Sequence, residues 1–389
     1  MNRRKFLGVS ALAGAGAMVV PEITMASSTA KAVIKEVFPT RKLGKTGIEI
    51  PILSMGAINP DNVAVIRAAY NAGLIFFDTA YDYQNGRNEE ALGAFFKDKD
   101  RSTFMISTRG GANLKSENFE TEFEEILNTS LRRLQMNYVD IYGVHGIQNP
   151  EAFTDPRLIN MLKKFKAEGK VKHIGFTTHA NKPELIDEAI KSGVFEVCQL
   201  SYNFKLGNLP QLFEAIQRGA DAGLGFIAMK TMAGGVENAE GKKKIDGAAC
   251  LRWVWSNPNI TTVFPGCSTF ELLENCLEAA RRPELDENDK KYLADLRDKN
   301  ELLYCQNCEK CVKDCSKHLP IPDIMRAYMY NYGYKQPLLS KETLVDLALS
   351  NNVCSDCTAC SVKCPSEFKV ADKIAAITPI VNVPSHFLT

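Results

Sequence analysis

Short apolar runs alternate with longer amphipathic segments from residue 41 to about residue 280. The runs have the length and the β-branched composition of buried strands, whereas the segments between them repeat apolar residues at helical spacing. Eight such strands, most of them followed by a helical stretch, predict an α/β fold of the (β/α)₈ TIM-barrel type. The predicted strands are residues 52–55, 74–77, 103–107, 139–144, 171–176, 194–200, 225–229 and 261–264.

The main alternative for such a pattern is a doubly wound open sheet. That fold would be expected to carry a G-x-G-x-x-G turn after an early strand, and this sequence has none there. In a barrel, chemistry gathers at the carboxyl ends of the strands, so polar residues at those ends are candidates for a site. They are Asp78, Arg109, His145, Thr177, Gln199 and Lys230. The predicted helices are residues 88–96, 119–134, 183–192, 209–222 and 271–280.

Eight of the twelve cysteines lie in the last ninety residues, in two runs with identical C-x₂-C-x₂-C-x₃-C spacing. In two-cluster ferredoxins such a run supplies three ligands to one [4Fe–4S] cluster, and its fourth cysteine ligates the other. Pro365 follows the second run as in that motif, whereas Ser316 stands at the same place after the first. The expected ligand sets are Cys305, Cys308, Cys311 and Cys364 for one cluster, and Cys354, Cys357, Cys360 and Cys315 for the other.

A pair of zinc sites is the alternative interpretation of these cysteines. Zinc would take four ligands from two C-x₂-C pairs, which gives no reason for three evenly spaced cysteines and a fourth. The spacing therefore favours two [4Fe–4S] clusters in a small, mainly helical ferredoxin-like domain, with helices at residues 322–330 and 344–349. The remaining cysteines sit in apolar or helical contexts and are expected to be buried thiols. They are Cys198, Cys250, Cys267 and Cys276.

The first 32 residues have the pattern of an export signal. Arg3 and Arg4 precede a mildly apolar stretch at residues 8–20, and Ala30 and Ala32 offer an A-x-A cleavage site. The paired arginines indicate the twin-arginine route, which moves folded proteins, so clusters assembled in the cytoplasm would survive transit. A transmembrane anchor is disfavoured, because these thirteen residues would rise only about 20 Å against roughly 30 Å of hydrocarbon. We expect a periplasmic protein without a transmembrane segment.

Composition agrees with a soluble globular chain, with 45% apolar and 24% charged residues. The net charge of +1 gives no basic field for a nucleic-acid partner. Loss of residues 1–32 would remove four basic residues and one acidic residue, which changes the net charge to −2. The predicted organisation is a signal at 1–32, a barrel at 33–282, a connecting helix at 283–303 and a two-cluster domain at 304–389.

Several separated segments resemble known motifs in the same order along the chain. Residues 73–83, followed by Asn88 and Glu89, closely resemble the Asp–Tyr signature of the aldo-keto reductases, and residues 139–145 resemble the family's histidine strand. Residues 169–176 and 265–275 add two further segments. The resemblance covers roughly residues 41–280. With the cysteine runs included, the chain resembles the branch of the aldo-keto reductases that has a twin-arginine signal and a C-terminal ferredoxin module.

The resemblance implies a catalytic tetrad of Asp78, Tyr83, Arg109 and His145. Tyr83 would be the general acid that gives a proton to the carbonyl oxygen, and His145 would orient the carbonyl. Because a free phenol has a pKa of about 10, a neighbouring cation is expected to lower the pKa of Tyr83. Arg109 stands where the family has lysine, and it supplies a fixed charge with a different shape and no transferable proton.

The resemblance also implies a nicotinamide nucleotide, NAD(P)(H). Thr178 replaces the family's usual asparagine, and Met229 stands where many members stack an aromatic ring on the nicotinamide. Gly266 and Glu271 stand where bases often hold a 2′-phosphate, which favours NAD(H). An exported enzyme would have to carry the nucleotide tightly bound, or its clusters would have to replace the recycling of the nucleotide. The implied nucleotide-binding residues are Thr177, Thr178, Gln199, Lys230, Ser268, Glu274 and Asn275.

We therefore expect an exported oxidoreductase that interconverts an aldehyde, ketone or sugar with an alcohol. Its clusters would relay electrons to or from an electron-transfer protein or a membrane quinone complex. A catalytically silent barrel that docks the ferredoxin module onto a partner is the first alternative, kept open by Arg109 and Met229. A conventional NADPH reductase with structural clusters is the second, and the missing phosphate-binding bases and the export signal count against it.

Overall fold

The computed structural model describes residues 36–388, except 57–61, 148, 180, 207–208, 234–244, 299–303, 306–309, 356 and 358. The predicted signal at 1–32 and the predicted ligand Cys308 therefore lie outside the described residues. Within the described part of the chain, no helix is both long enough and apolar enough to cross a membrane.

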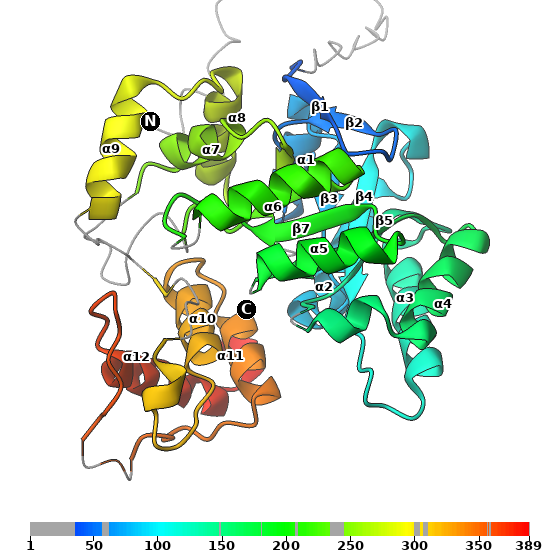
Figure 1. Cartoon of the computed structure of the whole chain (residues 1–389). Helices are drawn as coiled ribbons and strands as arrows, with labels where there is room; N and C mark the ends of the chain where they lie inside the picture. Colours follow the sequence, from blue (N-terminus) through cyan, green and yellow to red (C-terminus); the bar gives the residue numbers. More distant parts are fainter. Residues whose placement is uncertain are drawn as a thin grey trace, which may run out of the picture. The chain divides into compact units, whose positions relative to one another are not determined.

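Seven parallel strands form one sheet whose order in space follows their order in the chain (Figure 1). Residues 53–56 pair with both of its edge strands through isolated bridges, and so take the place of an eighth strand. Leu53 pairs with Val263 at one edge and Met55 with Phe77 at the other, which closes the barrel. The strands are β3 (Phe76–Asp78), β4 (Met105–Gly110), β5 (Val139–Val144), β6 (Val171–Thr178), β7 (Val197–Ser201), β8 (Gly225–Met229) and β9 (Ile260–Val263).

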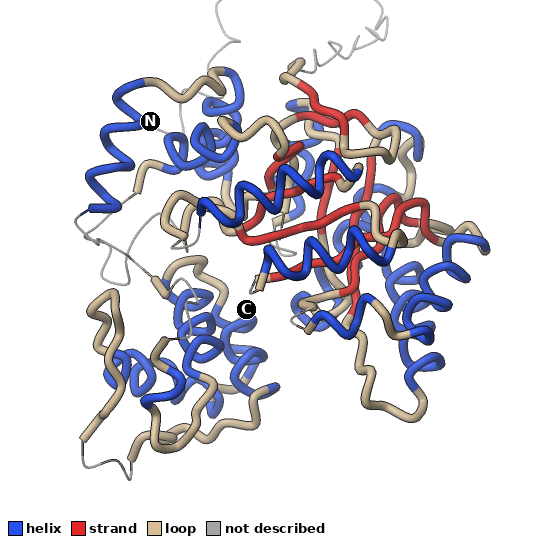
Figure 2. The backbone as a smooth tube through the Cα atoms, viewed as in Figure 1, coloured by secondary structure: helices blue, strands red, loops and turns tan. Residues whose placement is uncertain are grey.

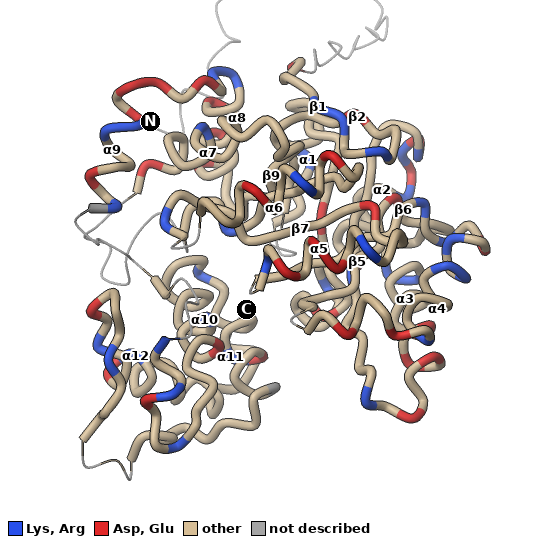
Figure 3. Tube along the Cα trace, viewed as in Figure 1, with Lys and Arg blue, Asp and Glu red and all other residues tan. Residues whose placement is uncertain are grey.

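Helices follow the strands and cover the outside of the sheet (Figure 2). Their apolar faces pack on the strands through a continuous core, in which the rings of Phe96 and Phe104 stack at 4.1 Å. Basic and acidic residues are interspersed along the outer helices (Figure 3). The helices of the barrel and of the segment after it are α1 (Val63–Ala72), α2 (Arg87–Phe96), α3 (Phe119–Leu134), α4 (Pro156–Ala167), α5 (Lys182–Ser192), α6 (Leu209–Ala222), α7 (Gly247–Trp255), α8 (Phe270–Arg281) and α9 (Glu287–Asp298).

Two local differences from the predicted elements have clear causes. The strand predicted at residues 103–107 begins only at Met105, because residues 101–103 form a 3₁₀ turn capped by the Asp100 carboxylate. Helix α4, like α1 and α7, was not among the predicted segments, although Asp155 caps it by accepting from two backbone N–H groups and Pro156 occupies its first turn. The 3₁₀ segments are η2 (Tyr83–Gly86), η3 (Arg101–Thr103), η4 (Pro150–Phe153), η5 (Val312–Asp314), η6 (Thr378–Asn382) and η7 (Ser385–Phe387).

An antiparallel hairpin of β1 (Thr40–Lys42) and β2 (Glu49–Pro51) covers the amino-terminal end of the barrel. The Arg41 guanidinium donates to the carbonyls of Trp255, Asn257 and Ile260 at 2.7–2.9 Å. Leu43 and Ile50 of the hairpin are fully buried in the cluster that fills the inside of the barrel. Since this end is sealed, only the carboxyl ends of the strands can carry a site.

The C-terminal domain (residues 304–388) is built from α10 (Ile321–Tyr332), α11 (Pro337–Asp346) and α12 (Val370–Ile377) around a hydrophobic cluster that it shares with earlier residues, among them Phe204, Ala249 and Leu293. The helix predicted at residues 322–330 corresponds to α10. The helix predicted at 344–349 is misplaced, because Leu344 belongs to the last turns of α11 and Ala348 already has a left-handed φ of 51°. Most helices do not continue through a non-glycine residue in that conformation.

Candidate active site

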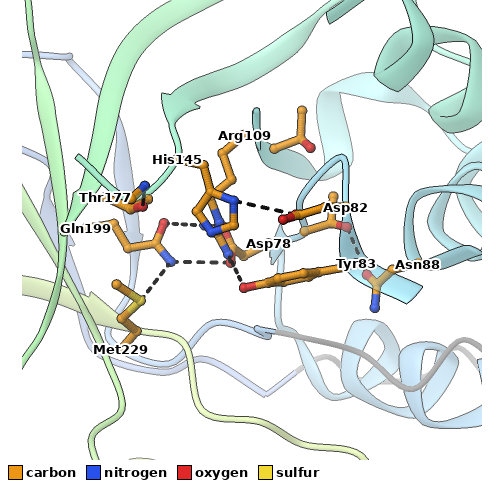
Figure 4. Close-up of polar contacts among 12 residues, drawn as sticks. Asp78, Asp82, Tyr83, Asn88, Arg109, His145, Thr177, Gln199 and Met229 are labelled. Atoms are coloured by element: carbon orange, nitrogen blue, oxygen red, sulfur yellow. Dashed lines mark hydrogen bonds and ion pairs between the residues drawn. The ribbon is translucent and has the colours of Figure 1, made fainter. Parts of the chain in front are cut away.

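A buried ion pair joins the carboxyl ends of two adjacent strands. Asp78 pairs in register with Ser107, and Arg109 lies two residues further on the same face of β4, so both side chains meet inside the barrel. Arg109 donates from Nη1 to Asp78 Oδ1 at 2.8 Å and from Nη2 to Oδ2 at 2.6 Å (Figure 4). Gln199 of β7 accepts from Arg109 at 2.7 Å and donates to Asp78 at 3.3 Å. These bonds fix the guanidinium and balance its charge with the carboxylate.

Tyr83 stands directly over this pair. It lies at the start of η2, and its Oη accepts a hydrogen bond of 3.1 Å from Arg109 Nη2. The next two residues, Gln84 and Asn85, have left-handed φ values of 46° and 54°, a strained conformation that the surrounding structure must hold. A chain of hydrogen bonds supports the turn, since Thr79 donates to Asn88, which donates to Gln84.

Arg109 does lower the pKa of Tyr83, as expected, but the net shift is in the opposite direction. Burial raises the pKa of this phenol to about 12, and the opposing effect of Arg109 is smaller. The negative charge of Asp78 also raises it, because the carboxylate that holds Arg109 cancels much of the cation's field. Tyr83 is therefore a neutral phenol at pH 7, able to donate a proton but seldom ionised.

His145 follows β5 and completes the predicted group of four. Its ring lies edge-on to the ring of Tyr83, with centroids 6.1 Å apart. Its Nδ1 lies 3.5 Å from Asp82 Oδ1 (Figure 4). Although burial opposes the effect, the hydrogen bond from His145 lowers the pKa of Asp82. The structure thus brings Asp78, Tyr83, Arg109 and His145 together at one point.

A cavity of about 1020 Å³ opens beside this group. Asp78, Tyr83 and Arg109 form its floor, and residues after β9 and along α8 form one side. Another part of its wall comes from the C-terminal domain, from the end of α10 and the start of α11. The volume is at the upper end of the range for small-molecule and cofactor sites. The residues from the C-terminal domain are Tyr330, Gly333, Tyr334, Lys335, Gln336 and Leu339.

The residues predicted to bind a nucleotide divide into two groups. Gln199, Lys230, Ser268 and Asn275 line the cavity, and the other three do not. Thr177 and Thr178 are buried at the end of β6, where the Thr177 hydroxyl accepts from the Gly146 N–H at 2.8 Å. The Glu274 carboxylate lies 2.7 Å from Arg281 and is 54% exposed.

Lys230 makes contacts that the sequence did not suggest. Its Nζ lies 4.7 Å from the ring centroid of Tyr330 and 4.8 Å from that of Tyr334. Burial, together with the charges of Arg326 and Arg109, lowers the pKa of Lys230 to about 7. The four-residue spacing of the two tyrosines did not indicate this contact, because Tyr330 lies in α10 and Tyr334 lies just beyond its end.

The cysteine runs lie in the turns around α10, α11 and α12. Burial raises the pKa of Cys354, and the nearby thiols of Cys357, Cys360 and Cys315 raise it further. These four are the set predicted for one cluster, including Cys315, which comes from the other run. Among the described residues, no three His, Cys, Asp or Glu side chains converge as they would around a single metal ion. Cys305, Cys315, Cys354, Cys357 and Cys364 are half-buried, Cys311 is buried and Cys360 is exposed.

Two hydrogen bonds hold the runs side by side. Ser361 donates from its hydroxyl to the carbonyl of Asp314, so the residues next to Cys360 and Cys315 are in contact. Lys317 donates to the carbonyl of Val353 at 3.0 Å. A fourth ligand from the first run is thus within reach of three from the second, and the donor set fits the crossed pattern of a two-cluster ferredoxin.

The other four cysteines are buried, as expected. Burial raises the pKa values of Cys198 and Cys250, which keeps both thiols protonated. Cys267 and Cys276 are neighbours, with their sulfur atoms 3.6 Å apart. None of the four belongs to the C-terminal runs.

Comparison with known proteins also divides the chain into a barrel and a C-terminal iron–sulfur domain. The family model described as "Aldo/keto reductase family" matches residues 54–249, and that described as "4Fe-4S dicluster domain" matches residues 304–369. The chain is 26% identical to "Probable aldo-keto reductase 1" of Glycine max over 217 residues, 51% of this chain and 61% of that protein. It is 32% identical to L-galactose dehydrogenase of Arabidopsis thaliana over 152 residues, 35% of this chain and 47% of that protein. The chain therefore spans about half to three fifths of these relatives.

Solved structures support the fold. The chain superposes on the aldo-keto reductase AKR11C1 from Bacillus halodurans with a TM-score of 0.56 and 18% identity, over 67% of this chain and 96% of that one. At this identity the likeness shows the barrel fold alone. Because the family model matches about half of the chain, from the first barrel segment to the start of α7, the chain belongs to the aldo/keto reductase family and ends in a 4Fe-4S dicluster ferredoxin domain.

Proposed function

We propose that the protein is an exported oxidoreductase that interconverts a carbonyl and an alcohol and exchanges electrons with an external partner through two [4Fe–4S] clusters. One observation carries the proposal. The neutral phenol of Tyr83 is held by a buried Asp78–Arg109 pair, in a cavity whose wall the ferredoxin domain completes. An aldehyde, a ketone or a sugar is the proposed substrate, and the similarity to an L-galactose dehydrogenase supports the sugar.

In the direction of reduction, Tyr83 gives its phenolic proton to the substrate oxygen. A nicotinamide nucleotide, when bound, supplies the hydride that makes such a reduction possible. Arg109 donates to the Tyr83 oxygen and so stabilises negative charge that develops there. Arg109 cannot relay the proton because it stays protonated, so the proton of Tyr83 is replaced from the cavity. His145 lies beside the phenol but does not line the cavity, so its proposed role in orienting the carbonyl rests on the resemblance to the family.

The residues of the cavity fit a nicotinamide nucleotide. Gln199, Lys230, Ser268 and Asn275 offer polar groups, and Gly266 leaves open space, since a Cβ there would meet no atom within 4 Å. Gly266 and Glu271 both line the cavity and neither can hold a 2′-phosphate, and the preference for NAD(H) rests on these two positions, because Arg281 and Arg282 also line the cavity. Thr177, Thr178 and Glu274 do not line it, so the proposal rests on the other four residues.

The identity of the nucleotide can be tested directly. The protein is purified without oxygen from the exported fraction and denatured, and the released small molecules are identified by mass spectrometry. We expect NAD in nearly stoichiometric amount. Recovery of NADP would overturn the preference for NAD(H), and a preparation that is active without any nucleotide would overturn the hydride step.

Export and the electron partner are part of the same proposal. An enzyme outside the cytoplasm needs another route for its electrons, because free nicotinamide nucleotide is scarce there, and clusters provide one. The proposed partners are an electron-transfer protein, such as a cytochrome, or a membrane quinone complex. The test of export changes Arg3 and Arg4 to Lys, which should retain the folded precursor in the cytoplasm. Unchanged delivery of cluster-loaded protein to the periplasm would refute the twin-arginine route.

The activity is tested through the clusters themselves. Oxidised protein is mixed anaerobically with alcohols and aldoses, and reduced protein with aldehydes and ketones, while the visible absorbance of the clusters is followed. At least one substrate class should reduce or reoxidise them. A silent barrel that only docks the ferredoxin domain remains the second candidate, favoured by Arg109 in place of lysine. No response to any member of the panel would favour that candidate.

A further inference from the structure

Part of the active-site wall belongs to the C-terminal domain. Tyr330, at the end of α10, lines the same cavity as Tyr83 and Arg109 although it lies more than two hundred residues further along the chain. The turn that carries Tyr83 is also tied to this domain, because Asn85 donates to Glu342 of α11 at 2.8 Å. The barrel motifs alone therefore do not make up the complete site.

The phenol of Tyr330 is close to the catalytic group. Burial raises its pKa, with Arg326, Asp82 and Arg109 as charged neighbours, and its presence in turn raises the pKa of Tyr83. Both phenols are therefore neutral donors at pH 7. No hydrogen bond joins Tyr330 to Tyr83, or to any other side chain in the described part of the chain. Tyr330 thus lines the cavity together with the proposed proton donor, and its hydroxyl has no side-chain hydrogen bond among the described residues.

Lys230 fixes the ring of Tyr330. Its Nζ lies over the rings of Tyr330 and Tyr334, whose centroids are 5.9 Å apart, in a cation–π arrangement. Lys230 has a left-handed φ of 56°, and Asn203 supports this strained backbone by donating to its carbonyl at 3.1 Å. Such strain is found where a side chain must be aimed at a particular place. A lysine of the barrel, Lys230, thus holds in place Tyr330 of the C-terminal domain.

We infer that Tyr330 is a specificity-determining residue of this site, whose hydroxyl binds a hydroxyl group of the substrate next to the reacting carbonyl. The substrate class is then a polyhydroxylated carbonyl compound, such as an aldose. Gln336 and Lys335 on the same wall supply further hydrogen-bonding groups for such a molecule. The inference rests on the proposed function, and it assigns part of substrate recognition to the ferredoxin domain.

The test compares Tyr330→Phe with Tyr332→Phe. Tyr332 is on the same helix and packs against Tyr328 at 4.5 Å, and it does not line the cavity, so it controls for loss of a phenolic hydroxyl. The probes are four aldoses (glucose, galactose, arabinose and xylose) and benzaldehyde with its alcohol. For the best aldose, kcat/KM should fall about tenfold or more in Tyr330→Phe. For the benzaldehyde pair, which has no second hydroxyl, it should change less than about threefold.

Equilibrium binding of the same aldoses to the cluster-loaded protein, measured by calorimetry, separates this inference from the proposed function. If wild type binds an aldose without turnover and Tyr330→Phe binds it about tenfold more weakly, the inference stands and the proposed reaction fails. An equal loss for aldose and benzaldehyde would overturn the inference, as would an equal effect of Tyr332→Phe. Failure of all four aldoses to bind wild type would overturn it too.

Discussion

The catalytic group of the barrel and the cysteine runs of the C-terminal domain are organised in different ways. In the barrel, Asp78, Arg109 and Gln199 come from three strands and satisfy one another in a closed set of hydrogen bonds. In the C-terminal domain, burial raises the pKa of Cys354 and the nearby thiols of Cys357, Cys360 and Cys315 raise it further, and bound iron would offset this cost of the thiolate form. The first site is preorganised by the fold, whereas we expect the second to depend on its clusters for stability.

The largest expected effect follows from that difference. Cys354→Ser should reduce the iron content from about eight to about four atoms per chain, because each cluster holds four irons. Since metal binding is coupled to folding, amides of α10 and α12 should lose protection from hydrogen exchange, while those of β4 to β8 keep theirs. Cys198→Ser, which removes a buried thiol of β7 outside the runs, is the control. Equal loss of protection from hydrogen exchange in the C-terminal helices and in the barrel strands would show that the barrel does not fold independently of the clusters.

The contribution of the Asp78–Arg109 ion pair to stability can be tested by removing one of its two charges. Asp78→Asn leaves the buried Arg109 without its carboxylate, which should cost about 3–5 kcal/mol of unfolding free energy. The exposed pair Arg218–Asp187 has a similar distance of 2.8 Å and serves as the control, since Asp187→Asn should cost less than about 1 kcal/mol. Denaturant unfolding followed by circular dichroism gives both values. A cost below 1 kcal/mol for Asp78→Asn would mean that the pair is not a rigid part of the site.

The raised pKa of Tyr83 predicts a pH profile. Oxidation of an alcohol needs the phenolate, and with a pKa of about 12 its fraction rises tenfold for each pH unit below that value. Above pH 8, where Lys230 with its pKa of about 7 has titrated, kcat/KM for oxidation should rise about tenfold per unit up to pH 10. Reduction, which needs the neutral phenol, should not fall over this range. A plateau of the oxidation rate near pH 8 would contradict the high pKa.

A further prediction concerns the buried ammonium group of Lys230. Its pKa is lowered to about 7 in the folded protein from 10.5, so between these values the unfolded chain binds a proton that the folded chain does not. Stability should therefore rise with pH across this window, and Lys230→Met should reduce the slope. Lys290→Met is the control, because that exposed lysine pairs with Glu287 on its own helix. An unchanged slope in Lys230→Met would show that the ammonium is not desolvated in the folded state.

Much of the barrel could be predicted because its signals are local. The helices at residues 119–134 and 209–222 and the strands at 139–144 and 225–229 have the predicted bounds, since each has a clear apolar period and a definite end. The segment at 52–55 was predicted as a strand and forms only bridges, with one edge strand on either side. That distinction depends on how the barrel closes, which is a tertiary property.

The site could be predicted only in part. The tetrad was found through a resemblance of short motifs, and the structure brings all four residues together. The sign of the pKa shift of Tyr83 was wrong, because it depends on burial and on how far Asp78 cancels the charge of Arg109. Tyr330 was missed, since nothing local shows that two separate domains share one cavity.

The central claim is that Tyr83 is the acid–base group of an active barrel. Tyr83→Phe removes one hydroxyl, so iron content and folding should not change, whereas substrate-dependent reduction of the clusters should slow by about 10² or more. Tyr81→Phe, a matched change two residues away and outside the cavity lining, should keep nearly the full rate. The opposite result would be that substrate reduces the clusters of the Tyr83→Phe variant as fast as those of wild type, while Cys360→Ser abolishes electron delivery to a partner. In that case the barrel is a docking scaffold.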